Sequence, residues 1–284
     1  MPYNRKIMTN DNRKISLEGT INTRDLGGLS TKDGRKIKKG LLIRTDCLYR
    51  LTKKDVEILS KDYHALYDID FRNEGERESR PEVEIPGCTI VNLSITNDHN
   101  MGRIPPKHKT YGITKTRLLT LMDFIYCLSP DGDAKKGMEQ SYRSYVSSRL
   151  GQTGYSTFLH LVLKAGGKGA VLFHCADGKD RAGIASALLL KALGVDDDTI
   201  LEDYLLTNSN VQEKKAKRLA ELQEKGMEEP LLSSCVMLAG VERNWLLSAM
   251  DEIETLFGGF DSYLRQELLF SDEERKELQD IYLE

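Results

Sequence analysis

A chain of 284 residues with 39% apolar and 30% charged residues has the composition of a globular protein with room for a substantial core. Its formal net charge of −3 gives no bulk electrostatic reason to bind nucleic acid or a membrane surface, so any preference for anions must come from a local site. No stretch has the apolar length of a membrane span. The cysteines form no Cys-x-x-Cys pair that would indicate a disulfide framework or a zinc site; they are Cys47, Cys88, Cys127, Cys175 and Cys235.

The polar N-terminus lacks the apolar segment that a signal peptide carries. The sequence as given therefore predicts a cytoplasmic protein, and a secreted protein whose signal peptide had been trimmed is the alternative. We expect a polar N-terminal arm over residues 1–16 and a single domain over residues 17–284. Residues 97–137 are the least regular part of the chain and contain His99 and His108, so we expect an insertion or a variable surface excursion there.

Apolar periodicity and capping signals predict strands and helices in the first two thirds of the chain and helices alone in the last third. Residues 19–44 contain an Asp-Gly hairpin signal and predict a small antiparallel unit. Thr52 with Asp55 and Ser271 with Glu274 resemble capping boxes. Further strands are expected at 65–71, 89–95 and 170–173, and helices at 52–63, 114–128, 139–150, 156–164, 181–193, 200–206, 211–225, 245–256, 260–268 and 271–283.

Two charged pairs lie where a site could form. Arg24 and Asp25 stand beside a Gly-Gly turn, and they are either a buried pair that supports an anion site or a pair on a surface turn. Asp70 and Arg72 come at the carboxyl end of an expected strand, which is where open α/β sheets place their sites. The charge run of residues 76–78 that follows has the composition of a solvated surface.

The strongest signal is the stretch from Lys168 to Leu193. Residues 170–173 are an apolar run long enough for one buried strand, and small and aliphatic residues from Arg181 onward predict a buried helix. Cys175 lies between these two elements, six positions before Arg181. A strand, a tight loop and a helix N-terminus together form an anion site, because the loop N–H groups and the helix dipole place positive potential at one point.

A cysteine at the start of such a loop has its thiol in positive potential, which favours the nucleophilic thiolate. Arg181 offers a planar fork for two phosphate oxygens, and Gly178 allows a tight turn. His174 could fix the loop or favour the thiolate through a hydrogen bond. The chemistry implied is phosphoryl transfer to sulfur and hydrolysis of a cysteinyl phosphate. The alternative is a buried structural cysteine followed by a helix that begins with arginine.

A bacterial family of cysteine-dependent protein tyrosine phosphatases has the loop His-Cys-x-Ala-Gly-Lys-Asp-Arg-Thr-Gly. This chain resembles that loop in His174-Cys175-Ala176-Asp177-Gly178-Lys179-Asp180-Arg181-Ala182-Gly183. The resemblance extends to residues 22–28, to Asp70-Phe71-Arg72 with Glu76, and to residues 203–208 and 263–283, and it omits about residues 97–137. It implies an α/β fold with a cysteine-phosphatase-like central sheet flanked by helices and a helical C-terminal third. It also implies hydrolysis of phosphotyrosine, with phosphoserine, phosphothreonine or phosphoinositides as further substrates.

Carried over by position, the resemblance implies that Cys175 is the nucleophile, Arg181 the phosphate clamp and Asp180 the general acid. Asp70 is the second choice for that acid, and Lys179 would contact a second phosphate or an anionic head group. The other substrate-binding positions implied are His174, Ala176, Asp177, Gly178, Ala182, Arg24 and Arg72. The implied partner is a phosphorylated protein or a phosphoinositide. Phosphate or sulfate is expected to bind in the loop, and no metal or cofactor is expected.

Two positions depart from the family loop. Ala182 stands where the family has a hydroxyl that helps the cysteine sulfur leave, so we expect slow breakdown of the phosphoenzyme. Asp177 replaces a small residue and would disfavour the thiolate if it faced the phosphate. The alternatives to an active phosphatase are a phosphate-binding module with weak or absent turnover, and a redox or sulfur-transfer enzyme, which would also use a cysteine in an anion loop.

Overall fold

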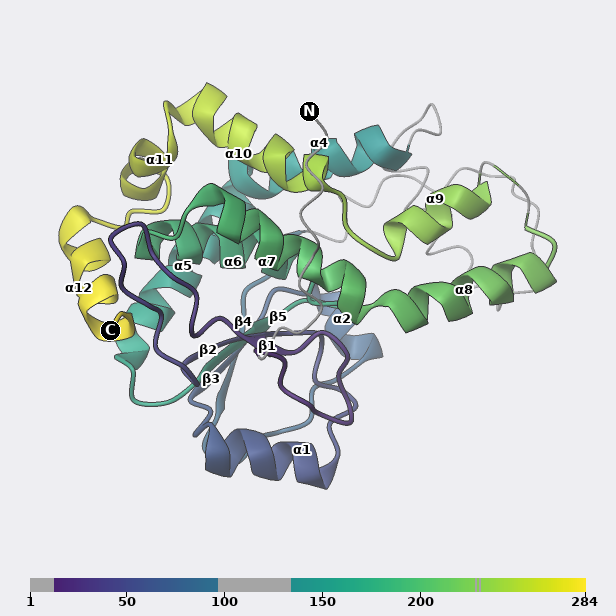
Figure 1. Ribbon diagram of the computed structural model, residues 1–284, viewed down its shortest axis with the longest axis horizontal. Coiled ribbons are helices and arrows are strands. Elements are labelled where there is room, and N and C mark those ends of the chain that lie inside the picture. Colours follow the sequence, from purple (N-terminus) through teal and green to yellow (C-terminus); the bar gives the residue numbers. More distant parts are fainter. Residues whose placement is uncertain (1–12, 97–133, 228, 230) are drawn as a thin grey trace.

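The structure is a computed structural model that describes residues 13–96, 134–227, 229 and 231–284. A five-stranded sheet lies at its centre, with strands in the order β1-β2-β5-β3-β4 (Figure 1). The strands are β1 Arg24–Asp25, β2 Leu42–Thr45, β3 Tyr67–Asp70, β4 Thr89–Asn92 and β5 Val171–His174. β1 is antiparallel to β2 and the other neighbours are parallel, which confirms the expected α/β class. The carboxyl ends of β2 to β5 therefore share one edge of the sheet.

Most of the expected helices are present, with the C-terminal part of the described chain entirely helical. The capping boxes at Thr52 and Ser271 are formed. Ser148 caps a new helix, which ends the expected helix 139–150 early. The helices are α1 Lys53–Glu57, η1 Ile58–Asp62, α2 Glu74–Ser79, α4 Ala134–Ser147, α5 Arg149–Ala165, α6 Arg181–Leu193, α7 Asp197–Asn210, α8 Gln212–Glu224, α9 Leu231–Leu238, α10 Arg243–Phe257, α11 Phe260–Gln266 and α12 Asp272–Tyr282.

The sheet separates two hydrophobic cores. The larger core packs against α4 to α7 and the C-terminal helices, and the smaller core lies on the side of α1 (Figure 1). Successive side chains of a strand point to opposite faces. In β5, Val171 and Phe173 accordingly belong to the larger core and Leu172 to the smaller one. His174 follows in the same alternation, so its side chain lies on the α1 side of the sheet.

Several expectations concern the ends and insertions of the domain. Residues 13–16 of the expected arm lie against the sheet, with Lys14 bridged to Arg24 and Ile15 buried in the smaller core. The expected helix 114–128 lies outside the described residues, as do His99, His108 and most of the expected insertion. In the part of the chain that the structure describes, no helix has both the length and the apolar character needed to cross a bilayer. Four cysteines there are free thiols, namely Cys47, Cys88, Cys175 and Cys235.

Candidate active site

Cys175 directly follows β5, and residues 176–180 form a loop that ends where α6 begins at Arg181. α6 is apolar around almost its whole circumference and is buried between the sheet and its neighbouring helices. This packing fixes the helix N-terminus next to Cys175, whose own exposure is 1%. The expected sequence of strand, loop and helix is therefore present, and the positive end of the α6 dipole faces the loop.

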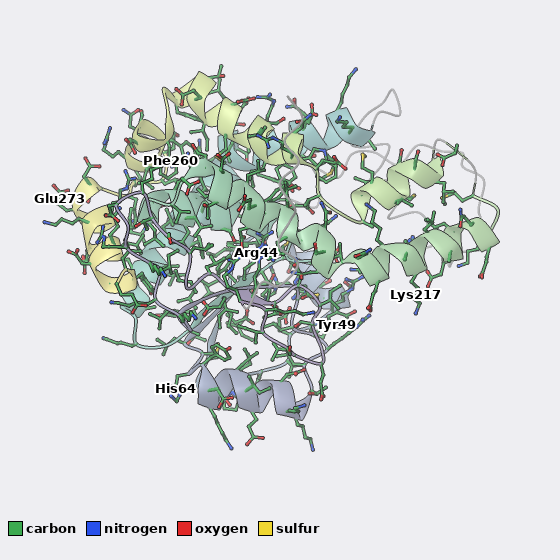
Figure 2. All side chains as sticks on the ribbon, in the orientation of Figure 1. Arg44, Tyr49, His64, Lys217, Phe260 and Glu273 are labelled. Carbon is green, nitrogen blue, oxygen red and sulfur yellow. The ribbon has the colours of Figure 1, made fainter. Side chains whose placement is uncertain are left out.

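The loop carbonyl groups are held by side chains from outside the loop. Nδ2 of Asn22 donates to the carbonyl oxygens of Asp177 and Gly178, at 3.1 Å each. Arg44 donates from Nε to the carbonyl of Gly178 at 2.9 Å and from Nη2 to that of Lys179 at 3.0 Å. Figure 2 shows Arg44 in the interior of the molecule, whereas the labelled Lys217 lies on the outlying α8.

These bonds determine where the loop N–H groups point. In a trans peptide, the C=O of one residue is opposed to the N–H of the next residue. With the carbonyls of Asp177, Gly178 and Lys179 turned to Asn22 and Arg44, the following N–H groups turn to the other side. Among the described residues, none accepts a hydrogen bond from the backbone N–H groups of residues 176–183. A set of unpaired N–H groups at a helix N-terminus is an anion-binding arrangement.

Gly178 is needed for this backbone path. Its φ is +64°, in the left-handed region that favours glycine. A Cβ at this position would also lie 2.2 Å from the carbonyl oxygen of Thr45. The loop therefore approaches the end of β2 too closely for any side chain.

Arg44 is itself held by a buried ion network. The Asp203 carboxylate on α7 contacts Arg44 at 3.2 Å, Arg24 at 3.1 Å and Arg13 at 2.9 Å. Burial alone raises the pKa of Asp203, but the charges of Arg24, Arg13 and Arg44 outweigh it and hold the pKa below its ordinary value. Arg24 is thus buried, which agrees with the interpretation of Arg24 and Asp25 as a buried pair. Its ionic partner, however, is Asp203 and not Asp25. Asp25 instead accepts from the N–H groups of Gly27 and Gly40.

Arg181 at the start of α6 is engaged by Glu76 from α2. Nη1 and Nη2 contact the two carboxylate oxygens of Glu76 at 2.6 and 2.7 Å, and Nη1 lies 3.4 Å from the carbonyl of Phe71. Burial raises the pKa of Glu76, but Arg181 outweighs it and holds the pKa below its ordinary value. The interpretation of residues 76–78 as a solvated charge run is therefore wrong at Glu76.

Asp180 is the N-cap residue of α6 and one of the proposed catalytic groups. Its Oδ1 accepts a hydrogen bond from the Tyr142 hydroxyl at 2.8 Å, and that hydroxyl lies 2.7 Å from the hydroxyl of Tyr204. The Asp180 side chain keeps 17% exposure, so it lies at the boundary between the buried tyrosine pair and solvent. Sequence reasoning identified neither tyrosine as part of the site.

The two other charged loop residues point elsewhere. The Lys179 ammonium donates to the carbonyl oxygens of Leu238 and Gly240, and its side chain is only 8% exposed. Asp177 pairs with Lys214 on α8 at the surface. Its carboxylate is therefore neutralised by a lysine, and Lys179 is tied to the segment between α9 and α10.

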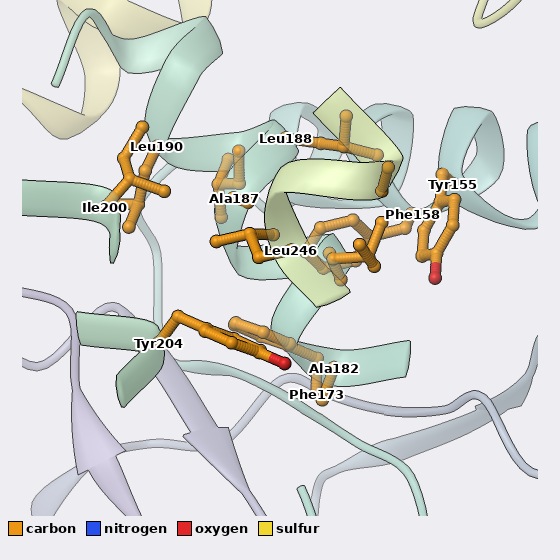
Figure 3. Close-up of a cluster of buried hydrophobic side chains, with 14 of the residues drawn as sticks. Tyr155, Phe158, Phe173, Ala182, Ala187, Leu188, Leu190, Ile200, Tyr204 and Leu246 are labelled. Carbon is orange, nitrogen blue, oxygen red and sulfur yellow. The ribbon is translucent and has the colours of Figure 1, made fainter. Parts of the chain in front are cut away.

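Ala182 lies in the first turn of α6 and is completely buried. Figure 3 shows it close to Phe173 of β5 and Tyr204 of α7. The position that carries a hydroxyl in the family loop thus belongs to the core here, and no side-chain hydroxyl is available from this residue.

The remaining predicted residues form a buried cluster beneath the loop, on the α1 side of the sheet. Asp70 and Arg72 are an ion pair at 2.8 Å, and Arg72 also contacts Glu82. Burial lowers the pKa of His174, but Asp68, Asp70 and Glu82 outweigh it and raise the pKa to about 10. Burial raises the pKa of Glu82 to about 7. Asp70 is thus fully buried against Arg72, and Asp68 and Glu82 were not identified from the sequence.

The fold and the loop together define an α/β protein with a Cys-x5-Arg loop between a strand and a helix N-terminus. A model of the tyrosine phosphatase family matches residues 15–284, and the chain belongs to that family. It is similar to a Cupriavidus necator protein provisionally named a tyrosine-protein phosphatase, with 29% identity over 89% of this chain and 84% of the relative. It is also similar to the triple specificity protein phosphatase PtpB of Mycobacterium tuberculosis, with 27% identity over 88% of this chain and 92% of the relative. The chain is therefore a hydrolase of the protein tyrosine phosphatase type.

Proposed function

We propose that the chain hydrolyses phosphotyrosine in proteins through a cysteinyl-phosphate intermediate, and that phosphoserine, phosphothreonine and phosphoinositides are further substrates. The observation that carries this proposal is the orientation of the loop, whose carbonyls are bound by Asn22 and Arg44 while its N–H groups are left for an anion. The printed name of the M. tuberculosis relative, a triple specificity protein phosphatase, supports testing more than one class of phosphate ester.

In the proposed first step, the Cys175 thiolate attacks phosphorus and forms the S–P bond. The bond from phosphorus to the ester oxygen breaks, and Asp180 gives its proton to the leaving oxygen. In the second step, Asp180 takes a proton from a water molecule whose oxygen attacks phosphorus. The S–P bond then breaks, and inorganic phosphate and the thiolate are released.

Arg181 and the loop N–H groups would hold the phosphate oxygens during both steps. A guanidinium has five N–H donors. Described residues engage three of them, two on Glu76 and one on the Phe71 carbonyl, which leaves two for phosphate. Glu76 would therefore fix the orientation of Arg181 before the substrate binds. Lys179 has its ammonium on two carbonyls, so we assign it to support of the loop and not to a second phosphate.

The test is turnover of p-nitrophenyl phosphate by the wild type and by Cys175→Ser. We expect the variant to lose activity by at least about 10⁴-fold, because it lacks the nucleophile. Cys235→Ser is the matched control, since burial raises the pKa of this thiol to about 11 and it lies in the packed α9 region. Equal activity of the wild type and Cys175→Ser would reject the proposed mechanism. A panel of phosphotyrosine, phosphoserine and phosphoinositide substrates then ranks the substrate classes.

A second candidate function, a phosphate-binding module with weak turnover, is favoured by one observation. Ala182 is buried and provides no hydroxyl to the departing sulfur. If this loss limits the enzyme, Ala182→Thr raises the rate of phosphoenzyme hydrolysis by about ten- to a thousand-fold. Rapid-quench measurement of the burst and of the steady state separates the two steps. Unchanged steady-state turnover in Ala182→Thr would show that breakdown of the intermediate is not slow for this reason.

A further inference from the structure

A group of metal-binding side chains lies beneath the catalytic loop. Asp68 from β3, His174 from β5 and Glu82 from the segment after α2 bring one ligand atom each within 4.8 Å of one another. Nε2 of His174 is 3.0 Å from Oδ1 of Asp68 and 3.8 Å from Oε1 of Glu82. All three side chains are at most 5% exposed. The group is therefore an interior feature and not a chance meeting of surface acids.

The polar atoms of this group face one another. Nδ1 of His174 lies 3.1 Å from the carbonyl oxygen of Cys175, which can only accept, so Nδ1 carries a hydrogen. The acidic neighbours hold a proton on Nε2 in the metal-free protein, and a metal ion would displace that proton to use the Nε2 lone pair that faces Asp68. Among the described residues, neither oxygen of Asp68 nor Oε2 of Glu82 has an aligned hydrogen-bond donor. Buried acceptors that face each other without a donor require a cation or protons between them.

The carboxylates of this group also outnumber its arginine. Asp68, Asp70 and Glu82 carry three negative charges when ionised, and Arg72 carries one positive charge. The Arg72 guanidinium contacts Asp70 and Glu82, and His174 is the cationic partner that the described residues offer Asp68. A protonated His174 balances one more of these charges, and a divalent cation in place of that proton would balance the remaining two.

We propose that Asp68, Glu82 and His174 bind a divalent transition-metal ion of the Zn²⁺ class beneath the catalytic loop. An imidazole nitrogen with two carboxylate oxygens suits Zn²⁺, Mn²⁺ or Co²⁺ better than Mg²⁺ or Ca²⁺, which prefer oxygen alone. Ligand atoms about 2.0–2.1 Å from a tetrahedral ion lie about 3.3 Å from one another, and the distances from His174 Nε2 here are 3.0 and 3.8 Å. The bond from Nδ1 to the Cys175 carbonyl is the second contact that metal-binding histidines usually make.

The role of the ion is structural. It joins β3, β5 and the segment carrying Glu82 at the point where β5 passes into the loop. The proposed metal site is separate from the proposed phosphate chemistry, because none of its three ligands is Cys175, Asp180 or Arg181. Its ligands are 14 and 92 positions apart along the chain, since Asp68 is followed by Glu82 and then by His174. Because of this spacing, the three ligands form no recognisable metal-binding motif along the chain.

The test uses the Cys175→Ser protein, so that the loop thiolate cannot bind the metal. After dialysis against a chelator, Zn²⁺ binding is measured by titration calorimetry and by metal analysis. We expect one ion per chain, with affinity weakened on the order of a hundred-fold or more in Asp68→Asn and in Glu82→Gln. Glu84→Gln is the matched control, because Glu84 is exposed and only two positions from Glu82, and it should bind as the parent does.

Co²⁺ provides a second readout that does not depend on activity. A site of one nitrogen and two oxygens gives visible Co²⁺ absorption without the near-ultraviolet thiolate bands that Cys47 or Cys88 would cause. Absence of Zn²⁺ binding by the correctly folded parent would overturn the proposal and leave a cluster neutralised by protons. Equal binding by Asp68→Asn and Glu82→Gln, or a thiolate band, would overturn it as well.

Discussion

On the helix-covered face of the sheet, Asp203 lies among Arg13, Arg24 and Arg44. On the opposite face, Arg72 and His174 lie among Asp68, Asp70 and Glu82. Both networks are buried at the carboxyl ends of the strands, but the first has an excess of arginine and the second an excess of carboxylate. The first network is closed by hydrogen bonds to the loop carbonyls, whereas the second leaves acceptors without donors. Burial of charge therefore serves two proposed purposes, which are support of an anion-binding loop and binding of a cation.

The largest expected difference between the networks is in stability. Asp203→Asn removes the carboxylate that the buried Arg24 and Arg44 share, and leaving these charges uncompensated should lower the free energy of unfolding by about 3–5 kcal/mol. Asp68→Asn in metal-free protein should cost less than this, because Asp70 and Glu82 remain beside Arg72 and His174. Urea unfolding of both variants measures this, and equal losses would contradict the contrast.

A smaller contrast should appear on acidification. Although burial raises the pKa of Asp203, the neighbouring arginines hold it below its ordinary value of 3.8. A carboxylate with a lowered folded pKa contributes its full stability above about pH 4 and loses it as the pH falls toward the lowered pKa. The stability difference between the wild type and Asp203→Asn should therefore shrink below about pH 4. Urea midpoints from pH 7 to pH 3 test this, and a difference independent of pH would argue against it.

Arg44→Lys tests whether the arginine network around Asp203 supports the loop. Lysine keeps a charge for Asp203 but lacks the fork that reaches the carbonyls of Gly178 and Lys179. Each lost bond from a charged donor is worth about 1.5–3 kcal/mol, so kcat/KM should fall by about ten- to a hundred-fold. Arg50→Lys, at an exposed arginine, is the control. Unchanged kcat/KM in Arg44→Lys would mean that the loop keeps its shape without this support.

The smallest effect is expected at the Tyr142 hydroxyl. Tyr142→Phe removes the donor to Asp180 and should lower kcat by about tenfold. A phosphotyrosine peptide should show a larger effect than p-nitrophenyl phosphate, whose leaving group needs less protonation. Equal losses on both substrates would point to a general structural defect.

The predictable part of the site is local in sequence. An apolar strand, Gly178 and a helix of small aliphatic residues follow one another without interruption, so the loop could be inferred directly. Its support could not be inferred, because Arg44 is 134 positions from Gly178 and 159 from Asp203. Helix α9 also went unnoticed, since its eight residues are too few for a helical period to stand out in the sequence.

The pair Arg24 and Asp25 shows a different reason for a missed contact. These residues form β1, and neighbouring side chains of a strand point to opposite faces. The two side chains therefore point away from each other and do not form an ion pair. The sequence places this pair beside a turn and so does not predict that the two residues separate. Arg24 instead reaches Asp203 and Asp25 binds backbone N–H groups.

The contact between Arg181 and Glu76 has a consequence for selectivity among ligands. One edge of the Arg181 guanidinium is already paired with the Glu76 carboxylate. A phosphate ester would therefore be attracted less strongly than by an arginine without a carboxylate partner. Preference for a doubly charged phosphate over singly charged anions then falls mainly to the peptide dipoles around the loop. If the loop binds phosphate as proposed, a negative charge on the protein thus helps to determine which of several competing anions binds.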